Sequence, residues 1–553
     1  MDRKRFLTSF LTSQPKVPEQ KFDQLERTSS GLSPYSGPWN TAQVTHLLKR
    51  TMFGAQKTDI DYFKSKTVSA AVDELVNTVV PVPSPPVNNY AAAVTDPDVP
   101  AGQTWVNAPY AQPVNNRRII SLTSWWIGLQ VQQTRSLTEK MVLFWHNHFP
   151  IDQATVNNSG YLYGYNALLR EFSLGNFKDF VKRITLEPAM LVYLNGRANK
   201  NGAPDENYAR ELQELFTMGK GLASMYTEDD VKAAAKVLTG YKDDPVARSY
   251  TFNPNNHDTT NKQFSSFYNN TIIAGKTGAT GEQELDDLLA MLFQQDELSM
   301  FICRKLYRFF VYYTIDATTE TNVIAPLATI FKNNNYEIKP VLLALFKSEH
   351  FYDVLNMGCM IKSPIDFMVG LCREFDVLFP DETIDYVPAY NLWQLINTTS
   401  SAINQGLLNP PNVAGWAAYY QEPQFYELWI NADSLPKRNK FSDVMIGSGY
   451  TMSGKKMIID PITFADGLSN PLDPNILISD SLDILYKIDV TQTTKDYLKT
   501  QILLSGQSSD SYWTAAWNTY KADPTNNTNK NIVLTRLRAL YKYIMDLSEY
   551  QLC

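Results

Sequence analysis

The sequence has few cysteines and few clustered basic residues. Its four cysteines are scattered and form no Cys-x-x-Cys pair, so neither a thiolate zinc site nor a disulfide framework is indicated. The net charge is −7, from 57 acidic and 50 basic residues, and the longest basic run is at residues 3–5. Because a nucleic-acid-binding protein needs a basic patch, we do not expect nucleic acid as a partner.

Common enzyme motifs and membrane-spanning segments are also missing. No Gly-rich phosphate loop, nucleophile elbow or H-E-x-x-H sequence is present, which excludes the commonest NTPase, serine-hydrolase and zinc-protease mechanisms. No apolar run reaches the roughly 18 residues that a transmembrane helix needs. We therefore predict no transmembrane segment.

The N-terminus resembles a degenerate export signal. Residues 3–7, Arg-Lys-Arg-Phe-Leu, are similar to a twin-arginine motif, but residues 8–15 are too short and polar for the hydrophobic region of such a signal. The predicted compartment therefore stays open between the periplasm or cell exterior and the cytoplasm.

Composition and periodicity predict a mainly α fold. With 553 residues, of which 44% are hydrophobic and 19% charged, the chain forms a large core in one or two domains. We predict a large multi-helix domain with long loops and a small β-hairpin insertion near residues 248–275. The expected division is an extended arm over 1–40, a helical domain over 41–440, and a C-terminal helical extension over 441–553 packed on the same body.

Several helix boundaries follow from local signals. The first helix is expected to start after Asn40, with Gly54 supplying the stop. Another is expected from Thr227, whose capping-box partner is Asp230, to Gly240. Between the first helices, a proline-rich stretch over 80–115 is too long for an ordinary connection, which favours a binding, covering or mobile segment.

The most informative segment is residues 145–149, Trp-His-Asn-His-Phe, which places two of the five histidines two residues apart in an aromatic setting. Such a pair is either one edge of a metal site or part of a buried, hydrogen-bonded network. The backbone decides between them. In an extended segment His146 and His148 face the same side, whereas on a helix they diverge by about 200°.

Two other polar groups are candidates for the same site. On the predicted helix over 207–219, one stripe carries Asn207, Arg210, Glu211 and Glu214. It is either an i,i+4 salt-bridge stripe or, if buried, a carboxylate pair that needs a metal, a proton or the histidines.

His257 and Asp258 lie in a polar turn between aromatic residues, which fits an Asx turn or a ligand pair equally well. Trp416, behind Gly415, is either a sugar-stacking platform or a core residue. A basic helical face at residues 304, 305 and 308 is expected to pair with the Glu211 stripe.

Taken together, the polar blocks resemble one bacterial family, known only as domain of unknown function 1800 (DUF1800). The resemblance extends from about His46 to Asn439, and the blocks that carry it are His46–Arg50 with Phe53-Gly54, Lys140–Phe149, Glu206–Phe216, Tyr226–Glu228 with Leu238–Tyr241, His257-Asp258 with Lys262, Lys362–Pro364, Pro411–Trp416 and Trp429–Asn431. The chain departs from this pattern at Tyr241, where the family usually has tryptophan, and in lacking the hydrophobic part of an export signal.

The resemblance implies no established activity. It does imply frequent export and, because the genes commonly neighbour those of another exported family with a phosphatase- and sulfatase-like fold, a protein partner of that kind.

Two functional hypotheses follow from these residues. In the first, His146, His148, His257 and Asp258 hold a divalent metal whose bound water is activated for hydrolysis, with Glu211 or Glu214 as general base and with Asn207, Arg210 and Trp416 binding the substrate. In the second, the same polar residues form a buried network in a non-catalytic scaffold or accessory protein.

Overall fold

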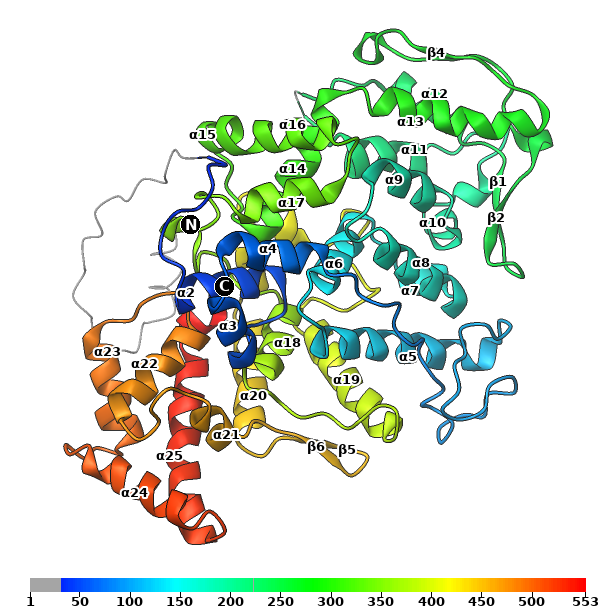
Figure 1. The fold of residues 1–553 in the computed structure, drawn as a ribbon. Helices are drawn as coiled ribbons and strands as arrows, with labels where there is room; N and C mark the ends of the chain where they lie inside the picture. The colour runs from blue at the N-terminus through cyan, green and yellow to red at the C-terminus, as the bar shows by residue number, and fades with distance from the viewer. Residues whose placement is uncertain (1–30, 222) are drawn as a thin grey trace.

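The computed structural model describes residues 31–221 and 223–553, so the twin-arginine-like segment and most of the predicted N-terminal arm lie outside it. The described part is 57% helical, and its strands form only three two-stranded antiparallel sheets. The predicted mainly α class is therefore confirmed (Figure 1). No helix in the described part is both long and apolar enough to span a membrane.

The N-terminal helices run across the middle of the molecule in Figure 1. Their bounds are α2 Thr41–Thr51, α3 Lys57–Lys64, α4 Val68–Asn77, α5 Gln112–Val131, α6 Thr138–His148, α7 Gln153–Val156 and α8 Ser159–Glu171. The first helix begins where the sequence predicts, because the side chain of Asn40 accepts a hydrogen bond from the N–H of Ala42. Beyond its end, Gly54 has a positive φ of 73°.

The central helices form the upper part of Figure 1, and their bounds are α9 Phe177–Thr185, α10 Pro188–Tyr193, α11 Asn207–Glu211, α12 Glu228–Val237, α13 Glu284–Leu292, α14 Asp296–Phe310, α15 Ala317–Thr319, α16 Ala325–Asn333 and α17 Ile338–Phe346. The capping box predicted for α12 is present, with Thr227 and Asp230 bonded reciprocally.

The predicted β insertion is present as two hairpins between α12 and α13, the first starting earlier than residue 248. Its strands β1 Tyr241–Asp244 and β2 Ser249–Phe252 pair with Tyr241 opposite Phe252, and β3 Lys262–Gln263 pairs with β4 Ile272–Ile273. A third hairpin, β5 Tyr450–Met452 with β6 Lys455–Met457, was not predicted.

The first C-terminal helices lie in the lower middle of Figure 1, the later ones lie at its lower left, and the end of the chain returns toward the centre. Their bounds are α18 Pro364–Glu374, α19 Tyr386–Ser401, α20 Ser434–Ile446, α21 Pro461–Asp466, α22 Pro474–Leu485, α23 Gln492–Tyr497, α24 Ser511–Ala522 and α25 Asn527–Asp546. After α25 the chain forms an antiparallel bridge between Ile361 and Leu552. Helix α20 spans residues 440 and 441, where the boundary between the helical domain and the C-terminal extension is expected. The division of the chain at this point stays a prediction.

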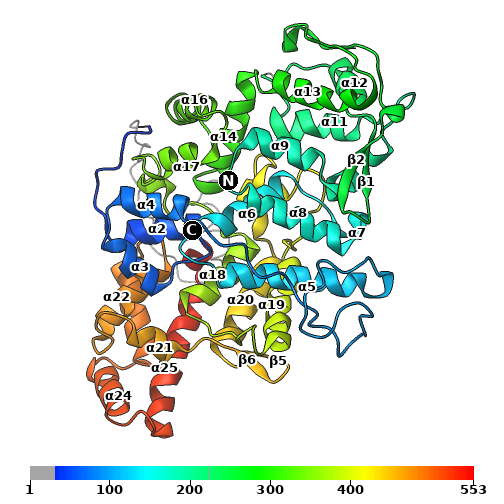
Figure 2. The ribbon, with the colours of Figure 1, turned by 45° about the vertical axis from the view of Figure 1, so that its right-hand side comes forward.

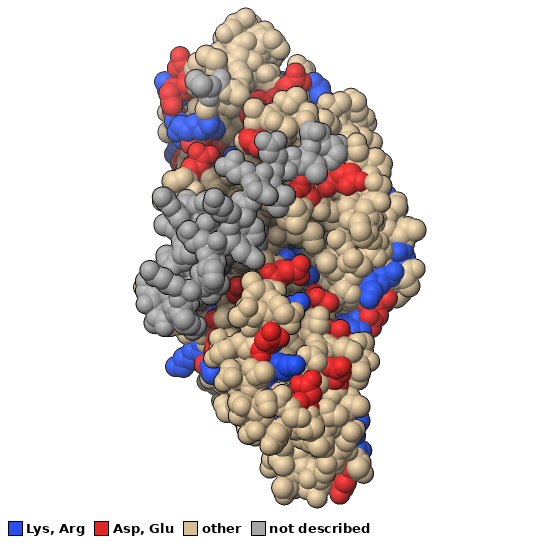
Figure 3. Space-filling model, turned by 90° about the vertical axis from the view of Figure 1, so that its left-hand side faces the viewer, with Lys and Arg blue, Asp and Glu red and all other residues tan. Residues whose placement is uncertain are grey.

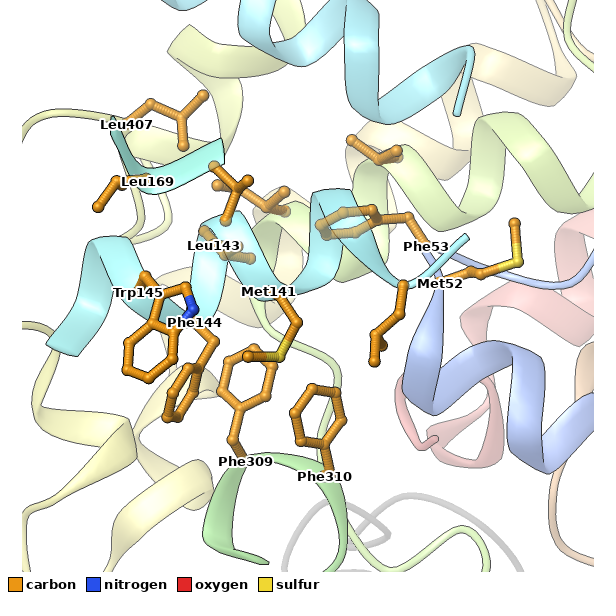
Figure 4. Close-up of a cluster of buried hydrophobic side chains, with 14 of the residues drawn as sticks. Met52, Phe53, Met141, Leu143, Phe144, Trp145, Leu169, Phe309, Phe310 and Leu407 are labelled. Carbon is orange, nitrogen blue, oxygen red and sulfur yellow. The ribbon is translucent and has the colours of Figure 1, made fainter. Parts of the chain in front are cut away.

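Helix α6 passes through the middle of the core, as Figures 1 and 2 both show. Apart from Thr138 and Asn147 its residues are buried, and Figure 4 shows Phe144 and Trp145 from α6 beside Phe309 and Phe310 from the end of α14. A helix that is buried on all sides belongs to the core. The polar residues at its end must therefore find partners inside the protein.

The surface carries mixed charge on the face drawn in Figure 3. There Lys and Arg side chains lie among Asp and Glu, with wide uncharged areas between them. Such interspersed charge gives no broad field of one sign on this face.

Candidate functional site

The first histidine of the pair tethers a distant loop. His146 lies on α6 and is fully buried; its Nε2 accepts the N–H of Leu408 at 3.0 Å, and its Nδ1 lies 2.9 Å from the hydroxyl of Tyr165. Since Nε2 accepts, Nδ1 carries the proton and donates to Tyr165, which itself donates to the carbonyl of Phe149 at 2.6 Å. Burial lowers the pKa of His146 to about 3, so the ring is neutral near neutral pH.

The second histidine faces a different segment. The Nε2 of His148 lies 3.0 Å from the carbonyl of Phe216, to which it donates, and its Nδ1 lies 3.2 Å from the Nζ of Lys305. Burial, reinforced by the charge of Lys305, holds the pKa of His148 well below its usual value. Because α6 is helical through His148, the two rings diverge and share no ligand position.

The residue between them, Asn147, holds a third segment. Its Oδ1 accepts the N–H of Trp416 at 3.0 Å. A Cβ placed on Gly415, whose φ is +84°, would lie 2.4 Å from the same oxygen. Only glycine fits there, because the turn has both a left-handed backbone and this close approach. The block Pro411–Trp416 is thereby fixed to the end of α6.

The predicted carboxylate helix is not one continuous α-helix. Helix α11 ends at Glu211 and continues as a π-helix, η2 Leu212–Thr217. Two carbonyls near its end, those of Leu215 and Phe216, accept hydrogen bonds from Lys305 and His148. Side chains from α6 and α14 therefore bond to the end of the π-helix, and a local pattern cannot show such contacts.

The stripe on α11 and η2 forms ion pairs with other partners than predicted. Arg210 pairs with Glu228 at 2.7 Å and Glu206 at 3.1 Å, and Glu214 pairs with Lys220 at 3.0 Å. The expected i,i+4 pair between Arg210 and Glu214 does not form.

The other residues near this stripe also bond elsewhere. Asn207 donates from Nδ2 to the carbonyl of Leu194 at 3.3 Å. The basic face of α14 does not pair with Glu211 as predicted, because Arg304 pairs with Glu297 and Glu320.

Glu211 differs from its neighbours because it forms no ion pair within the described residues. It is partly buried, and burial together with the charge of Glu214 raises its pKa. Near it, the pKa of Tyr193 is raised to about 12 by burial and by the charges of Asp152 and Glu211. The charges of Glu211 and Asp152 therefore both act on Tyr193.

His257 and Asp258 belong to a separate buried cluster. The Nε2 of His257 lies 3.1 Å from Glu284, whose other oxygen lies 2.5 Å from the Nζ of Lys262, and Asp258 lies 3.8 Å from the same Nζ. Burial would raise the pKa of Glu284, but hydrogen bonds from His257 and Lys262 outweigh it and lower that pKa. Lys262 and Glu284 thus form a buried ion pair, with His257 and Asp258 beside it.

The predicted metal site is not assembled within residues 31–221 and 223–553. No group of three or more His, Cys, Asp or Glu side chains there is placed to hold a metal ion. His146 and His148 are bonded to other segments, and His257 lies with Glu284 rather than with Glu211 or Glu214.

The segments tied down by α6 form one side of an open groove of about 760 Å³. Trp416 lies at this groove but is only 2% exposed, so it offers an edge and is no stacking platform. The groove is lined by Asp152, Ala154, Ser401, Asn404, Gly406, Asn409, Pro410, Pro411, Trp416, Ala417, Ala418, Gln421, Leu428 and Trp429.

A family model described as a protein of unknown function, DUF1800, matches residues 46–552. The chain belongs to the DUF1800 family. Neither the curated proteins nor the solved structures gave a significant match.

Within this DUF1800 fold, blocks that are far apart in sequence meet at α6. His146 and Asn147 reach the loop and turn at Leu408 and Trp416, and His148 reaches the π-helix. Leu408 and Tyr165 were not predicted at the site, and Lys305 was predicted to pair with the Glu211 stripe rather than to lie at His148. A leucine in a turn, a tyrosine on a helix and one lysine in a basic run carry no local sign of these contacts. The sequence Asn-Pro-Pro at residues 409–411 is typical of a turn and marks this loop, but it does not indicate the partner of the loop.

Proposed function

We propose that this DUF1800 protein is a non-catalytic accessory protein, in which a buried polar network holds a rigid binding groove in shape. One observation carries the proposal: three consecutive residues, His146 to His148, bond to three segments, two of which border the groove. Side chains used in this way position a site and do not react in it.

The contacts of the histidines support the accessory role over a metal-dependent one. To bind a metal through Nε2, His146 would have to release the N–H of Leu408, and His148 would have to release the carbonyl of Phe216. Each buried polar group left without a partner costs roughly 1–3 kcal/mol.

The partner we propose is the exported phosphatase- or sulfatase-like protein that the family resemblance implies. Purified full-length chain and purified partner, mixed at micromolar concentration and run on size-exclusion chromatography with light scattering, should elute as one complex. Elemental analysis of the chain alone should show no stoichiometric metal.

Two results would overturn this role. One is the absence of any complex with the partner. The other is stoichiometric metal that disappears in a folded His146→Ala, His148→Ala variant, because that would return the histidines to a metal site.

A second candidate function is metal-free hydrolysis with Glu211 as general acid, and the raised pKa of Glu211 favours it. Glu214 would then act by keeping that pKa high. A Glu211→Gln variant should abolish any hydrolysis, while Asp229→Asn, at an exposed position of α12, should leave it unchanged. Equal rates in both variants would exclude Glu211.

A further inference from the structure

The groove is lined by amide side chains that form no hydrogen bond with other described residues. Asn404, Asn409 and Gln421 line it, are exposed, and form no side-chain hydrogen bond within the described part of the chain. Asp152 adds a carboxylate, one oxygen of which already accepts from Thr155. Each free amide has a donor and an acceptor in one plane, as a pair of neighbouring hydroxyls requires.

The charge of the groove restricts what it can bind. No Lys or Arg lines it, and Asp152 is its one charged residue among those described. An anionic ligand, such as a phosphate, a sulfate or a nucleic acid, would meet a carboxylate and no cation. A neutral ligand rich in hydroxyl groups meets no such penalty.

Two residues at or beside the groove have left-handed backbone conformations. Asn404 and Leu408 have φ of 80° and 58°, and for a bulky residue such as leucine this region is rarely occupied. Strain of roughly 1–3 kcal/mol per residue persists only where the surroundings impose it. At Leu408 the backbone N–H is bonded to the buried His146, which helps to hold this conformation. A groove shaped before its ligand arrives loses less entropy on binding.

We propose that this groove binds a neutral oligosaccharide, with the amides of Asn404, Asn409 and Gln421 as hydrogen-bonding groups. The accessible apolar groups of Pro411, Ala417 and Leu428 form the surface under the sugar rings. The volume of about 760 Å³ falls in the range of sites for compact organic ligands. This ligand class rests on the proposed accessory function, in which the chain holds a glycan for its partner.

The test uses the isolated full chain and isothermal titration calorimetry with neutral cello-, xylo-, malto- and chito-oligosaccharides. One series should bind with a dissociation constant between about 1 μM and 1 mM. The variant Asn404→Gly, Asn409→Ala, Gln421→Ala should weaken that binding by about tenfold or more. Glycine is chosen at 404 because it keeps the positive φ.

A matched control removes the same chemistry elsewhere. Gln294→Ala with Asn333→Ala deletes two exposed amides that do not line the groove, and it should leave the affinity unchanged. Gln421→Ala alone, in an exposed loop, serves as the variant if the triple change unfolds the chain, and it should still lower the affinity.

Three outcomes overturn the ligand class: no neutral series binds at about 10 mM, the groove variants bind as well as the control, or a proline-rich peptide binds in the groove while no glycan does. Partner complex formation is measured separately, so any of these with an intact complex leaves the accessory role standing. Cleavage of a bound glycan, seen by chromatography, would instead retain the ligand class and overturn the non-catalytic role.

Discussion

The Nε2 of His146 accepts the backbone N–H of Leu408 at 3.0 Å, across 262 residues of chain. The acceptor sits on a helix buried in the core, and the donor sits in a left-handed turn beside the groove. One hydrogen bond thus connects the backbone beside a surface groove to the interior packing of α6.

Replacing His146 by alanine should destabilise the protein by about 2–4 kcal/mol, because it leaves the Leu408 N–H without a partner and opens a cavity. Urea unfolding measures the change. Tyr165→Phe, which removes only the hydroxyl that receives the His146 proton, should cost about 1 kcal/mol. A His146→Ala variant as stable as the parent would show that the bond to Leu408 contributes nothing.

Acid should destabilise the fold through its buried neutral histidines. The folded pKa of His146, about 3, lies below the ordinary value of 6.5, so unfolding takes up a proton. The contribution of the neutral His146 ring to the free energy of unfolding is complete above pH 6.5 and is lost as the pH falls toward 3. The free energy of unfolding, measured with urea between pH 7 and 4, should decrease as the pH falls. In His146→Gln the number of protons taken up on unfolding should be smaller by one. An unchanged number in that variant would contradict the buried, neutral assignment.

Glu187 should make the protein less stable as the pH rises, which is opposite to the effect of the buried histidines. Burial raises its pKa from 4.5 to about 7, so folding takes up a proton there and stability decreases as the pH rises from about 4.5 to 7. Because the side chain is only partly enclosed, Glu187→Gln should stabilise the protein at pH 8 by between about 1 and 3 kcal/mol, with little gain at pH 4. Thermal melts at both pH values measure this, and an equal effect at the two would rule out the raised pKa.

Removing one charged partner from the buried cluster around Glu284 should lower the free energy of unfolding strongly. Lys262→Met leaves Glu284 with only His257 as a basic neighbour, and removing one partner of a buried ion pair costs about 3–5 kcal/mol. The double variant Lys262→Met, Glu284→Gln should recover part of that loss, because no carboxylate remains unpaired. A double-mutant cycle from denaturant melts measures the coupling; additive losses would mean that the two side chains do not interact.

Local signals predicted local structure well. The start of α2 after Asn40, the capping box at Thr227 and Asp230, and the hairpin region after Gly240 depend on residues within a few positions of one another, and all are present. The mainly α class follows from the same short-range periodicity.

The site could not be predicted in the same way, because its contacts are long-range. His146 and His148 were correctly singled out as a pair that needs partners, but nothing near them in sequence indicates Leu408 or Lys305. The π-helix at Leu212–Thr217 likewise receives hydrogen bonds from side chains of other helices. A local pattern shows that a polar residue is buried, whereas the tertiary fold decides which group it meets.

Synthesis of the chain imposes an order on these contacts. A ribosome adds about 5–20 residues per second, so the 262 residues that separate His146 from Leu408 take between about 13 and 52 seconds to appear. During that interval the aromatic residues of α6 lack the C-terminal part of their enclosure. A nascent chain of this protein is therefore a client for chaperones that cover exposed hydrophobic segments, and limited proteolysis of chains stalled before residue 408 should cut within α6.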